Sequence, residues 1–296
     1  MDDPFAIIEI PKEEAKVFDQ MIKTYRKKHI RQAAKVVESV FSKYPQLESQ
    51  LLKERKASTV IAKAREYAWQ EFLLEEAAFN TAVLRELHEK LKTPDVILND
   101  LIKKEVLGKS GVDLIGSIKH ICGEYAGKIY PYIYTLSLSN TNSRRSRAGS
   151  TFEAIIYQIY SYLKYPFDSQ EKVGRKVFEN AGLGKKVDSV LPSIAAFGIR
   201  RDKVIIGTMK TSLRERWQEV AEEIERTKIP VIHLLTVDTE IPTNKAAEMS
   251  AHNIVVVALQ DVINTEGLRP VKNIISFEDY FFSEVPNFLE FWKGKL

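Results

Sequence analysis

Two charged residues interrupt apolar segments in the second half of the sequence. Asp188 lies within KKVDSVLP, and Lys210 ends the segment KVIIGTMK, twenty-two residues later. Burial of an unpaired carboxylate is costly, so a buried acid normally has a cation or hydrogen-bond donors beside it. If the two segments form neighbouring strands, the Lys210 ammonium emerges at the end of its strand next to Asp188. This acid–lysine pair is the first candidate for chemistry.

The next segment, SLRERWQEVAEEIERT, has helical spacing and carries several acids. Its apolar stripe consists of Leu213, Trp217, Val220 and Ile224. At about 100° per residue, Glu223 lies about 60° from Val220, whereas Glu222 lies about 160° away. We therefore expect Glu223 to border the core and reach the strand ends, and Glu222 to face water. Trp217 is expected to anchor the core.

An acid on one strand, a lysine on the next and an acid from a helix suit the binding of Mg²⁺ at a phosphodiester. Mg²⁺ prefers carboxylate and phosphate oxygens and lowers the pKa of bound water, while a lysine orients that water and offsets charge on the phosphorane. The alternative is a buried Asp188–Lys210 pair with Glu223 on the surface. Spacing alone does not choose between these interpretations.

The start of the same helix carries the triplet Arg214-Glu215-Arg216. Arginine donates two hydrogen bonds to guanine O6 and N7, and glutamate accepts one from the cytosine amino group, so the triplet suits consecutive G·C pairs in the major groove. A solvated helix face is the competing interpretation.

Two halves of the sequence differ in rhythm. Residues 11–128 show helical spacing in five segments separated by Pro45, Pro94 and Gly108. From residue 128, KIYPYIYTLSLS is expected to be extended, with Tyr130, Tyr132 and Tyr134 alternating along a strand, and NTNSRRSRAGS to be turn-rich. Later apolar runs alternate with helical segments, as in an α/β fold with a mixed or parallel sheet. We predict a helical domain over 1–128 and a catalytic domain over 129–296.

Composition narrows the classes of protein. The 296-residue chain has a net charge of +4 and one cysteine, Cys122, so an intramolecular disulfide is excluded and a reducing cytoplasm is expected. The sequence shows no signal peptide or apolar run long enough to span a bilayer, so a soluble protein is predicted. Glycine-rich phosphate-binding motifs and zinc-ligand spacings are absent, which gives no support to a nucleotide cofactor. Basic residues gather at Lys23–Arg31 and at 144–147, where contact with phosphate or simple solvation are both possible.

Together, RRSRAGSTFE, KVDSVLPS, MKTSLRERW and the distal Glu223 resemble a branch of type II restriction endonucleases with the PD-(D/E)XK fold. The resemblance covers about residues 140–260, and members of this branch recognise CCGG, CCNGG or CCWGG. It implies a mixed-sheet core preceded here by an all-helical N-terminal domain. The pairing of such a domain with this core is most similar to enzymes of the BsaWI type, which cut within WCCGGW.

The resemblance implies a role for each matching residue. Asp188 would be the metal-binding acid, Lys210 the catalytic lysine and Glu223 a second metal ligand moved onto the helix, while Glu153 would support the site. Arg214, Glu215 and Arg216 would read bases, and Arg145 and Arg147 would contact DNA. Two positions depart from the common motif: Val187 replaces a proline, and Thr208 stands where an acid is usual.

The expected activity is Mg²⁺-dependent cleavage of double-stranded DNA at a palindrome with a CCGG core, such as WCCGGW. A CCNGG or CCWGG site, or a DNA-binding protein of the same fold that does not cut, are the alternatives. A palindromic site implies two-fold related active sites and hence a homodimer or a higher homo-oligomer.

Overall fold

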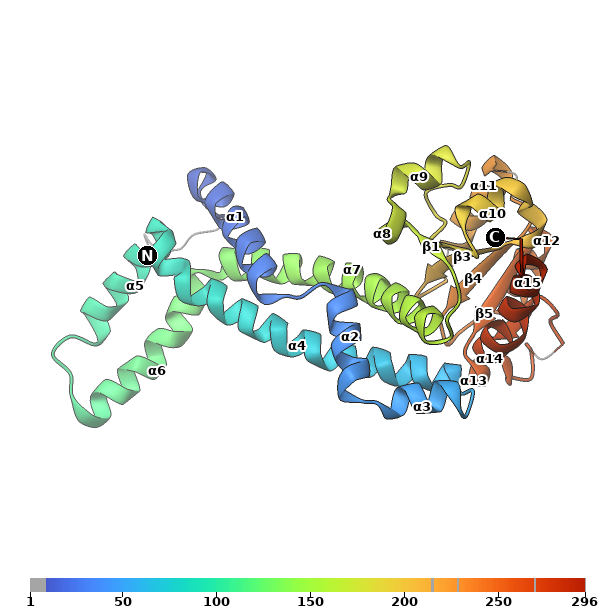
Figure 1. The fold of residues 1–296 in the computed structure, drawn as a ribbon. Coiled ribbons are helices and arrows are strands. Elements are labelled where there is room, and N and C mark those ends of the chain that lie inside the picture. Colours follow the sequence, from blue (N-terminus) through green and yellow to red (C-terminus); the bar gives the residue numbers. More distant parts are fainter. Residues whose placement is uncertain (1–8, 214–215, 228, 269, 296) are drawn as a thin grey trace. The chain divides into compact units, whose positions relative to one another are not determined.

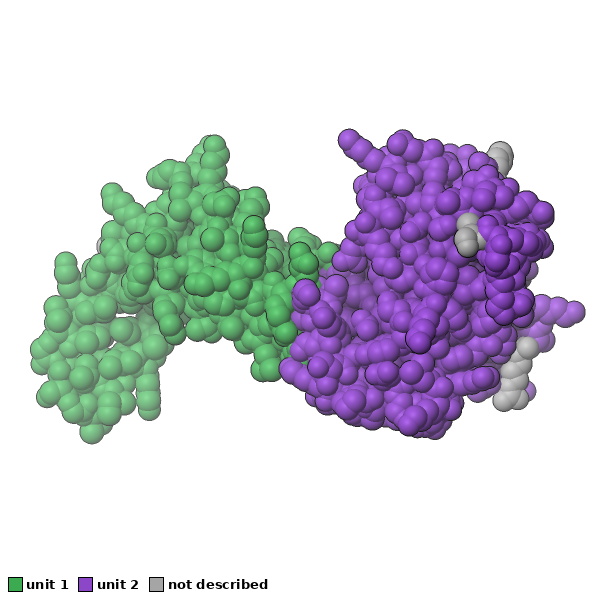
Figure 2. All heavy atoms as spheres, in the orientation of Figure 1, with its two compact units in different colours: residues 1–32, 69–146 green, residues 33–68, 147–296 purple. Residues whose placement is uncertain are grey.

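The computed structural model describes residues 9–213, 216–227, 229–268 and 270–295. The chain forms two compact units, one made of residues 1–32 and 69–146 and the other of residues 33–68 and 147–296 (Figure 2). This division differs from the one at 128/129 expected from the rhythm of the sequence, because residues 33–68 pack with the second half of the chain.

The first unit is built from helices. These are α1 (Lys12–His29), the later part of α4 (Ala57–Lys90), α5 (Lys92–Glu105), α6 (Gly111–Lys128) and the first part of α7 (Tyr130–Tyr162). Its core joins apolar stripes of several helices, and the ring of Phe18 on α1 meets Tyr132 on α7 edge to face at 5.3 Å. The predicted helical character of residues 11–128 is confirmed within the described part of the chain.

The segment from Tyr130 to Ser150 was expected to be extended and then turn-rich, and this prediction is wrong: it lies within helix α7. Ile129, Tyr132 and Leu136 are buried, whereas Tyr130 and Tyr134 are exposed, which is a helical rather than an alternating pattern of burial. The strand preference of tyrosine and isoleucine depends on context, and packing of Tyr132 in the helical core outweighs it here. Pro131 is compatible with the first turn of a helix.

The second unit contains a six-stranded mixed sheet (Figure 1). Its strands, in spatial order, are β1 (Asp168–Ser169), β2 (Ser189–Leu191), β3 (Ile205–Lys210), β4 (Ile232–Thr236), β5 (Ile254–Ala258) and β6 (Ile274–Ser276). β1, β2 and β3 pair antiparallel, and β3 to β6 pair parallel. The apolar segments around Val190 and Ile206, expected as neighbouring strands, are β2 and β3.

Helices pack against both faces of this sheet, because side chains alternate along each strand. On one face, Ile205 and Met209 of β3 join a core with α2 (Ala33–Lys43), α3 (Gln46–Leu52), the start of α4 and the end of α7. On the other, Ile206 joins a core with Trp217 of α11 (Arg216–Thr227) and Met249 of α12 (Thr243–Ala251). Trp217 is therefore the core anchor that its spacing predicted.

Short helices complete the unit. They are α8 (Gln170–Val173), α9 (Arg175–Asn180), α10 (Ile194–Ile199), the 3-10 turn η1 (Arg201–Lys203), α13 (Gln260–Ile263), α14 (Phe277–Asp279), the π-helical turn η2 (Tyr280–Glu284) and α15 (Val285–Trp292). The last three form a continuous packing segment, with Phe277 and Phe281 buried in the core. Within the described ranges, no helix combines the length and apolar character needed to cross a membrane.

Candidate active site

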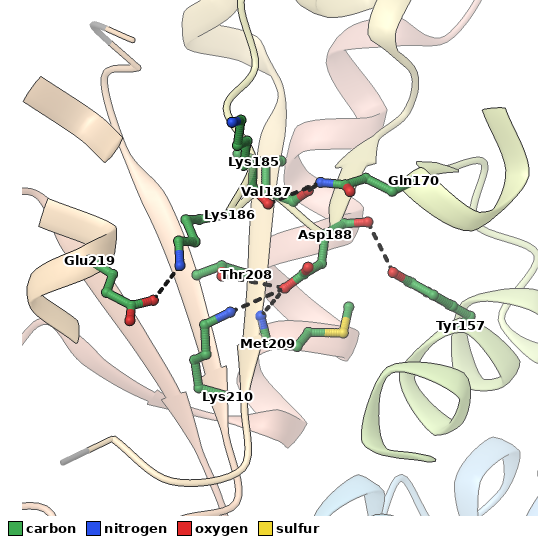
Figure 3. Close-up of polar contacts among 10 residues, drawn as sticks. All are labelled: Tyr157, Gln170, Lys185, Lys186, Val187, Asp188, Thr208, Met209, Lys210 and Glu219. Atoms are coloured by element: carbon green, nitrogen blue, oxygen red, sulfur yellow. Dashed lines mark hydrogen bonds and ion pairs between the residues drawn. The ribbon is translucent and has the colours of Figure 1, made fainter. Parts of the chain in front are cut away.

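The antiparallel pairing of β2 and β3 places Asp188 beside Lys210. Ser189 is opposite Gly207, and the backbone N–H of Asp188 donates to the Gly207 carbonyl at 2.9 Å. Since β3 runs on from Gly207 to Lys210, its end passes the Asp188 side chain. The Lys210 Nζ lies 3.8 Å from the Asp188 Oδ2 (Figure 3). The predicted proximity of the two groups is therefore confirmed.

Donors from β3 complete the surroundings of Asp188. Its Oδ2 accepts hydrogen bonds from the Met209 backbone N–H at 2.6 Å and from the Thr208 hydroxyl at 3.3 Å (Figure 3). Burial raises the pKa of the Asp188 carboxyl, while Lys210 and these donors act in the opposite direction. Only 17% of the Asp188 side chain and 14% of the Lys210 side chain are exposed, so the pair is held in a largely desolvated setting.

A second acid reaches this pair from α7. Burial and the nearby Asp188 raise the pKa of Glu153 to about 7, and Lys210 partly opposes the shift. Glu153 thus interacts electrostatically with both Asp188 and Lys210, and the negative charge is under-compensated when both carboxyl groups are ionised. Carboxylate oxygens are the ligands that hard divalent cations prefer, so the donor set fits such an ion. Among the described residues, no group of three histidine, cysteine or acidic side chains is arranged to hold a metal.

Thr208 explains how the site departs from the usual motif. Its side chain is fully buried and its hydroxyl donates to Asp188, so the position normally occupied by an acid supplies a hydrogen-bond donor here. A neutral hydroxyl offers a cation less than a carboxylate does. Any second carboxylate ligand must therefore come from outside β3, from Glu153 or from Glu223.

Glu223 is buried, as its helical position predicted, while Glu222 is exposed. Its Oε1 accepts a short hydrogen bond from the Arg226 guanidinium. The same carboxylate lies against Gly184, where an added Cβ would come within 0.8 Å of Oε1. In this conformation its contacts are therefore with Arg226 and the chain before β2, and its role as a metal ligand stays a prediction.

Contacts of α11 show how this helix follows the same segment. Glu219, one turn before Glu223, forms an ion pair with Lys186 at 2.6 Å (Figure 3). Because Glu219 meets Lys186 and Glu223 meets Gly184, the helix runs antiparallel to the chain that leads to Asp188.

The predicted base-reading triplet precedes these contacts. Arg214 and Glu215 lie outside the described residues, as does the side chain of Arg216, the first residue of α11. The connection before them is held by the Leu213 backbone N–H, which donates to the Asp238 carboxylate at 2.7 Å.

The basic cluster upstream of Glu153 lies on α7. Arg145 is exposed, whereas Arg147 is only 8% exposed, so this conformation presents Arg145 to solvent more than Arg147. Arg144 donates to the buried carboxylate of Glu76. Within the earlier cluster, Arg26 donates to Ser139 and Asn140, and Arg31 pairs with two glutamates.

Two residues that position Asp188 were not predicted from the sequence. The Tyr157 hydroxyl donates to the Asp188 carbonyl at 2.9 Å, and the Gln170 amide donates to the Val187 carbonyl at 2.6 Å (Figure 3). Burial raises the pKa of Tyr157, which keeps its hydroxyl protonated and able to donate. Tyr157 lies four residues after Glu153, on the same face of the helix, and this spacing is the signal that identifies it once α7 is known to be helical.

A mixed sheet with an acid and a lysine on adjacent strands, joined by an acid from a flanking helix, defines the restriction-endonuclease class of fold. Comparison with protein families agrees: the model described as EcoRII C terminal matches residues 121–281. The type II restriction enzyme SsoII of Shigella sonnei is 30% identical over 266 residues, which cover 88% of this chain and 79% of that enzyme. The chain belongs to the EcoRII C-terminal family and is a type II restriction enzyme.

Solved structures extend the similarity to the fold. Metal-depleted Ecl18kI in complex with uncleaved DNA is 28% identical with a TM-score of 0.73, and the match covers 94% of this chain and 85% of that one. Metal-depleted Ecl18kI in complex with uncleaved, modified DNA is 27% identical with a TM-score of 0.73, and the match covers 93% of this chain and 84% of that one. The PspGI–substrate DNA complex, at 17% identity and a TM-score of 0.59 over 88% of this chain and 94% of that one, supports the fold alone. These findings confirm the enzyme class, while the resemblance to CCGG cutters of the BsaWI type stays a prediction.

Proposed function

We propose that this enzyme hydrolyses phosphodiester bonds of double-stranded DNA at a short palindromic site with a CCGG core, WCCGGW being the first choice, and that it requires Mg²⁺. The observation that carries the proposal is the placement of Asp188, Lys210 and Glu153 in one partly buried cluster. The DNA complexes of similar enzymes support double-stranded DNA as the substrate.

Asp188 and Glu223 are the proposed ligands of Mg²⁺, with Glu153 supporting the site. When bound, the ion would supply a Lewis acid that lowers the pKa of water and offsets charge on the phosphate. Asp188 is already oriented by Met209 and Thr208, and Tyr157 holds its backbone. Glu223 must turn away from Arg226 to take this role, since its carboxylate is now engaged there.

Lys210 is the proposed catalytic lysine. Its ammonium group lies at the end of β3, where it is held near Asp188 by charge attraction. From that position it can donate to the attacking water and to a phosphate oxygen on which charge grows, and its limited exposure strengthens both interactions. Replacement by a neutral side chain would remove both effects.

Recognition is assigned to Arg214, Glu215 and Arg216, which suit G·C pairs in the major groove. A second candidate site is a palindrome interrupted by one base, CCNGG or CCWGG. It is favoured by the segment RRSRAG at 144–149, which resembles the DNA-contacting segment of CCWGG cutters and assigns Arg145 and Arg147 to DNA contact. Either palindrome implies a homodimer or a higher homo-oligomer.

The helical part of the chain is proposed to join subunits or to contact flanking DNA through Lys23–Arg31. Arg26 and Arg31 make internal hydrogen bonds, whereas Lys27 and Lys28 are exposed. These two lysines are therefore the better candidates within the cluster for phosphate contact.

Digestion of a sequenced plasmid tests the proposal. With Mg²⁺ we expect discrete fragments whose ends map to one palindrome, and without a divalent ion we expect none. The mapped ends distinguish a continuous CCGG core from an interrupted one. A smear of random fragments would contradict site-specific cleavage, and binding without cleavage under all divalent ions would contradict the proposed chemistry.

A further inference from the structure

A polar hollow of about 430 Å³ is lined in part by the segment that leads to Asp188. Its lining includes Lys185, Arg201 of η1, and Arg226 and Thr227 at the end of α11. A cavity needs only about 10–15 Å³ of such space to hold one water molecule, so this hollow is much larger than a water site. It is therefore large enough to admit a phosphate group together with its water shell.

The lining of this hollow has an excess of positive charge. Its acidic residue, Glu179, is paired with Arg175 at 3.1 Å. Within the ranges that the structure describes, neither the Lys185 ammonium nor the Arg201 guanidinium forms an ion pair with a carboxylate. The Arg226 guanidinium forms an ion pair with the Glu223 carboxylate. Two cationic side chains thus face the hollow without a neutralising acid.

Arg201 is positioned by an aromatic ring rather than by a carboxylate. Its Cζ lies 4.9 Å from the centre of the Phe197 ring, and Phe197 is buried. Gly182, with φ of +78°, carries the chain past the guanidinium, and an added Cβ would lie 3.9 Å from Nη2. Stacking leaves the edge of a guanidinium free to donate, which is the geometry used to bind phosphate oxygens.

The hollow lies close along the chain to the proposed active site. Lys185 precedes Asp188 by three residues, so their Cα atoms are at most about 11 Å apart. Measured along the duplex axis, that upper limit corresponds to a rise of roughly three base pairs at about 3.4 Å each. A duplex placed at Asp188 therefore brings phosphates of its own backbone within reach of Lys185.

We propose that Lys185, Arg201 and Arg226 form a subsite for a DNA backbone phosphate a few nucleotides from the cleaved bond. This inference rests on the proposed function, since it takes duplex DNA as the ligand. Arg226 both lines the subsite and donates to Glu223, so a phosphate bound there competes with Glu223 for the guanidinium. Arg226 is thereby a positioning residue: its attraction to DNA releases the Glu223 carboxylate.

Binding without cleavage tests the subsite. A labelled duplex is titrated by fluorescence anisotropy, in EDTA and at several salt concentrations, against the wild-type chain, Lys185→Gln and Arg201→Gln. The control is Lys203→Gln, which removes a lysine of the same turn that pairs with Asp202 and does not line the hollow. We expect each subsite variant to bind about tenfold more weakly and to lower the salt slope by about 1. Affinities and slopes equal to those of the control would overturn the proposal.

A methylphosphonate scan identifies the phosphate. Neutralising one backbone position at a time should weaken wild-type binding at one position, and Arg201→Gln should be insensitive to that same change. Inorganic phosphate, added without DNA, is the second arm. A thermal shift that depends on Arg201, combined with a silent scan, would assign the hollow to a free phosphate and overturn the DNA proposal.

The link to Glu223 has its own test, again without metal. Glu223→Gln removes the competitor for Arg226, so binding to the duplex should tighten several-fold, and the gain should vanish in the Arg226→Gln background. Glu222→Gln, which removes an exposed acid next to it, controls for general charge. Equal gains in both backgrounds would refute the link, and because no step requires cleavage, these outcomes are independent of the proposed activity.

Discussion

Buried acids serve opposite purposes in the two units of this enzyme. In the helical unit, Glu14 of α1 accepts hydrogen bonds from the Thr93 backbone N–H and hydroxyl, both at 2.9 Å, and from the Tyr132 hydroxyl at 2.6 Å. In the sheet unit, Asp188 pairs with Lys210, Glu153 interacts electrostatically with both, and burial raises the pKa of both carboxyl groups. The first acid has its oxygens satisfied, whereas the second pair keeps capacity for a ligand.

The hydrogen bonds accepted by each acid distinguish a structural carboxylate from one that can bind a ligand. Glu14 of α1 joins three helices, since Thr93 lies in the first turn of α5 and Tyr132 in α7. Without the Glu14 carboxylate, the groups of Thr93 and Tyr132 that donate to it would lose their acceptor. The Asp188–Glu153 cluster is instead held in a state that a cation would stabilise. Four experiments test this distinction and the roles assigned to the site residues.

The largest effect is expected on catalysis. Asp188→Ala and Lys210→Ala should each lower the cleavage rate by about 10³-fold or more, because each removes a charged group proposed to act on the phosphate. Both variants should keep far-UV circular dichroism and cooperative melting close to wild type. Rates are measured on a plasmid bearing the mapped site, with Lys203→Gln as a control. Retention of full activity in either variant would exclude that residue from the chemistry.

A loss of stability is expected at Glu14. Glu14→Ala leaves three donors without their acceptor, the Tyr132 hydroxyl among them buried, and should lower the free energy of unfolding by about 3 kcal/mol. Tyr132→Phe removes one of these donors together with its hydrogen bond and should cost less. Urea denaturation compares the two variants. An unchanged midpoint for Glu14→Ala would show that this acid is not the structural one.

The opposite sign is expected at Glu153. Burial and the nearby Asp188 raise its pKa to about 7 from the ordinary value of 4.5, so ionisation destabilises the fold as pH rises from about 4.5 to 7. Glu153→Gln cannot ionise and should therefore be more stable than wild type at pH 8, by at most about 3 kcal/mol, and nearly equal at pH 4. The measurement is denaturation in EDTA across this range. A variant that is destabilised equally at both pH values would contradict the cluster described here.

The smallest effect is expected on recognition. Arg214→Ala should lower the preference for the correct site over a site with one changed base by about tenfold, because one bidentate contact to guanine is lost. Competition between two oligonucleotide duplexes measures this ratio. A uniform loss of affinity for both duplexes would instead indicate a phosphate contact.

Local patterns in the sequence were sufficient for the acid–lysine pair. Asp188 and Lys210 were each identified because they interrupt an apolar run, and the antiparallel pairing of the two adjacent strands brings the side chains together. The apolar stripe of α11 likewise predicted that Glu223 is buried and Glu222 exposed, because the pattern of a helix is regular over its length.

Helix α7 shows why local patterns failed elsewhere. The run of Tyr130, Tyr132 and Tyr134 is compatible with a strand, and only the burial of Tyr132 against Phe18 and Glu14 decides for a helix. The contact between Tyr157 and Asp188 could not be predicted from the sequence, because it depends on the helical conformation of α7.

Strands β2 and β3, the buried face of α11 and the two members of the acid–lysine pair could be predicted from sequence, because each depends on regular spacing along one or two elements. The tertiary structure alone decided which further groups meet that pair. It joined residues 33–68 to the second half of the chain, brought Glu153 to Asp188 and paired Glu223 with Arg226. These contacts join segments distant in sequence, and their energies come from burial and charge that no local pattern records.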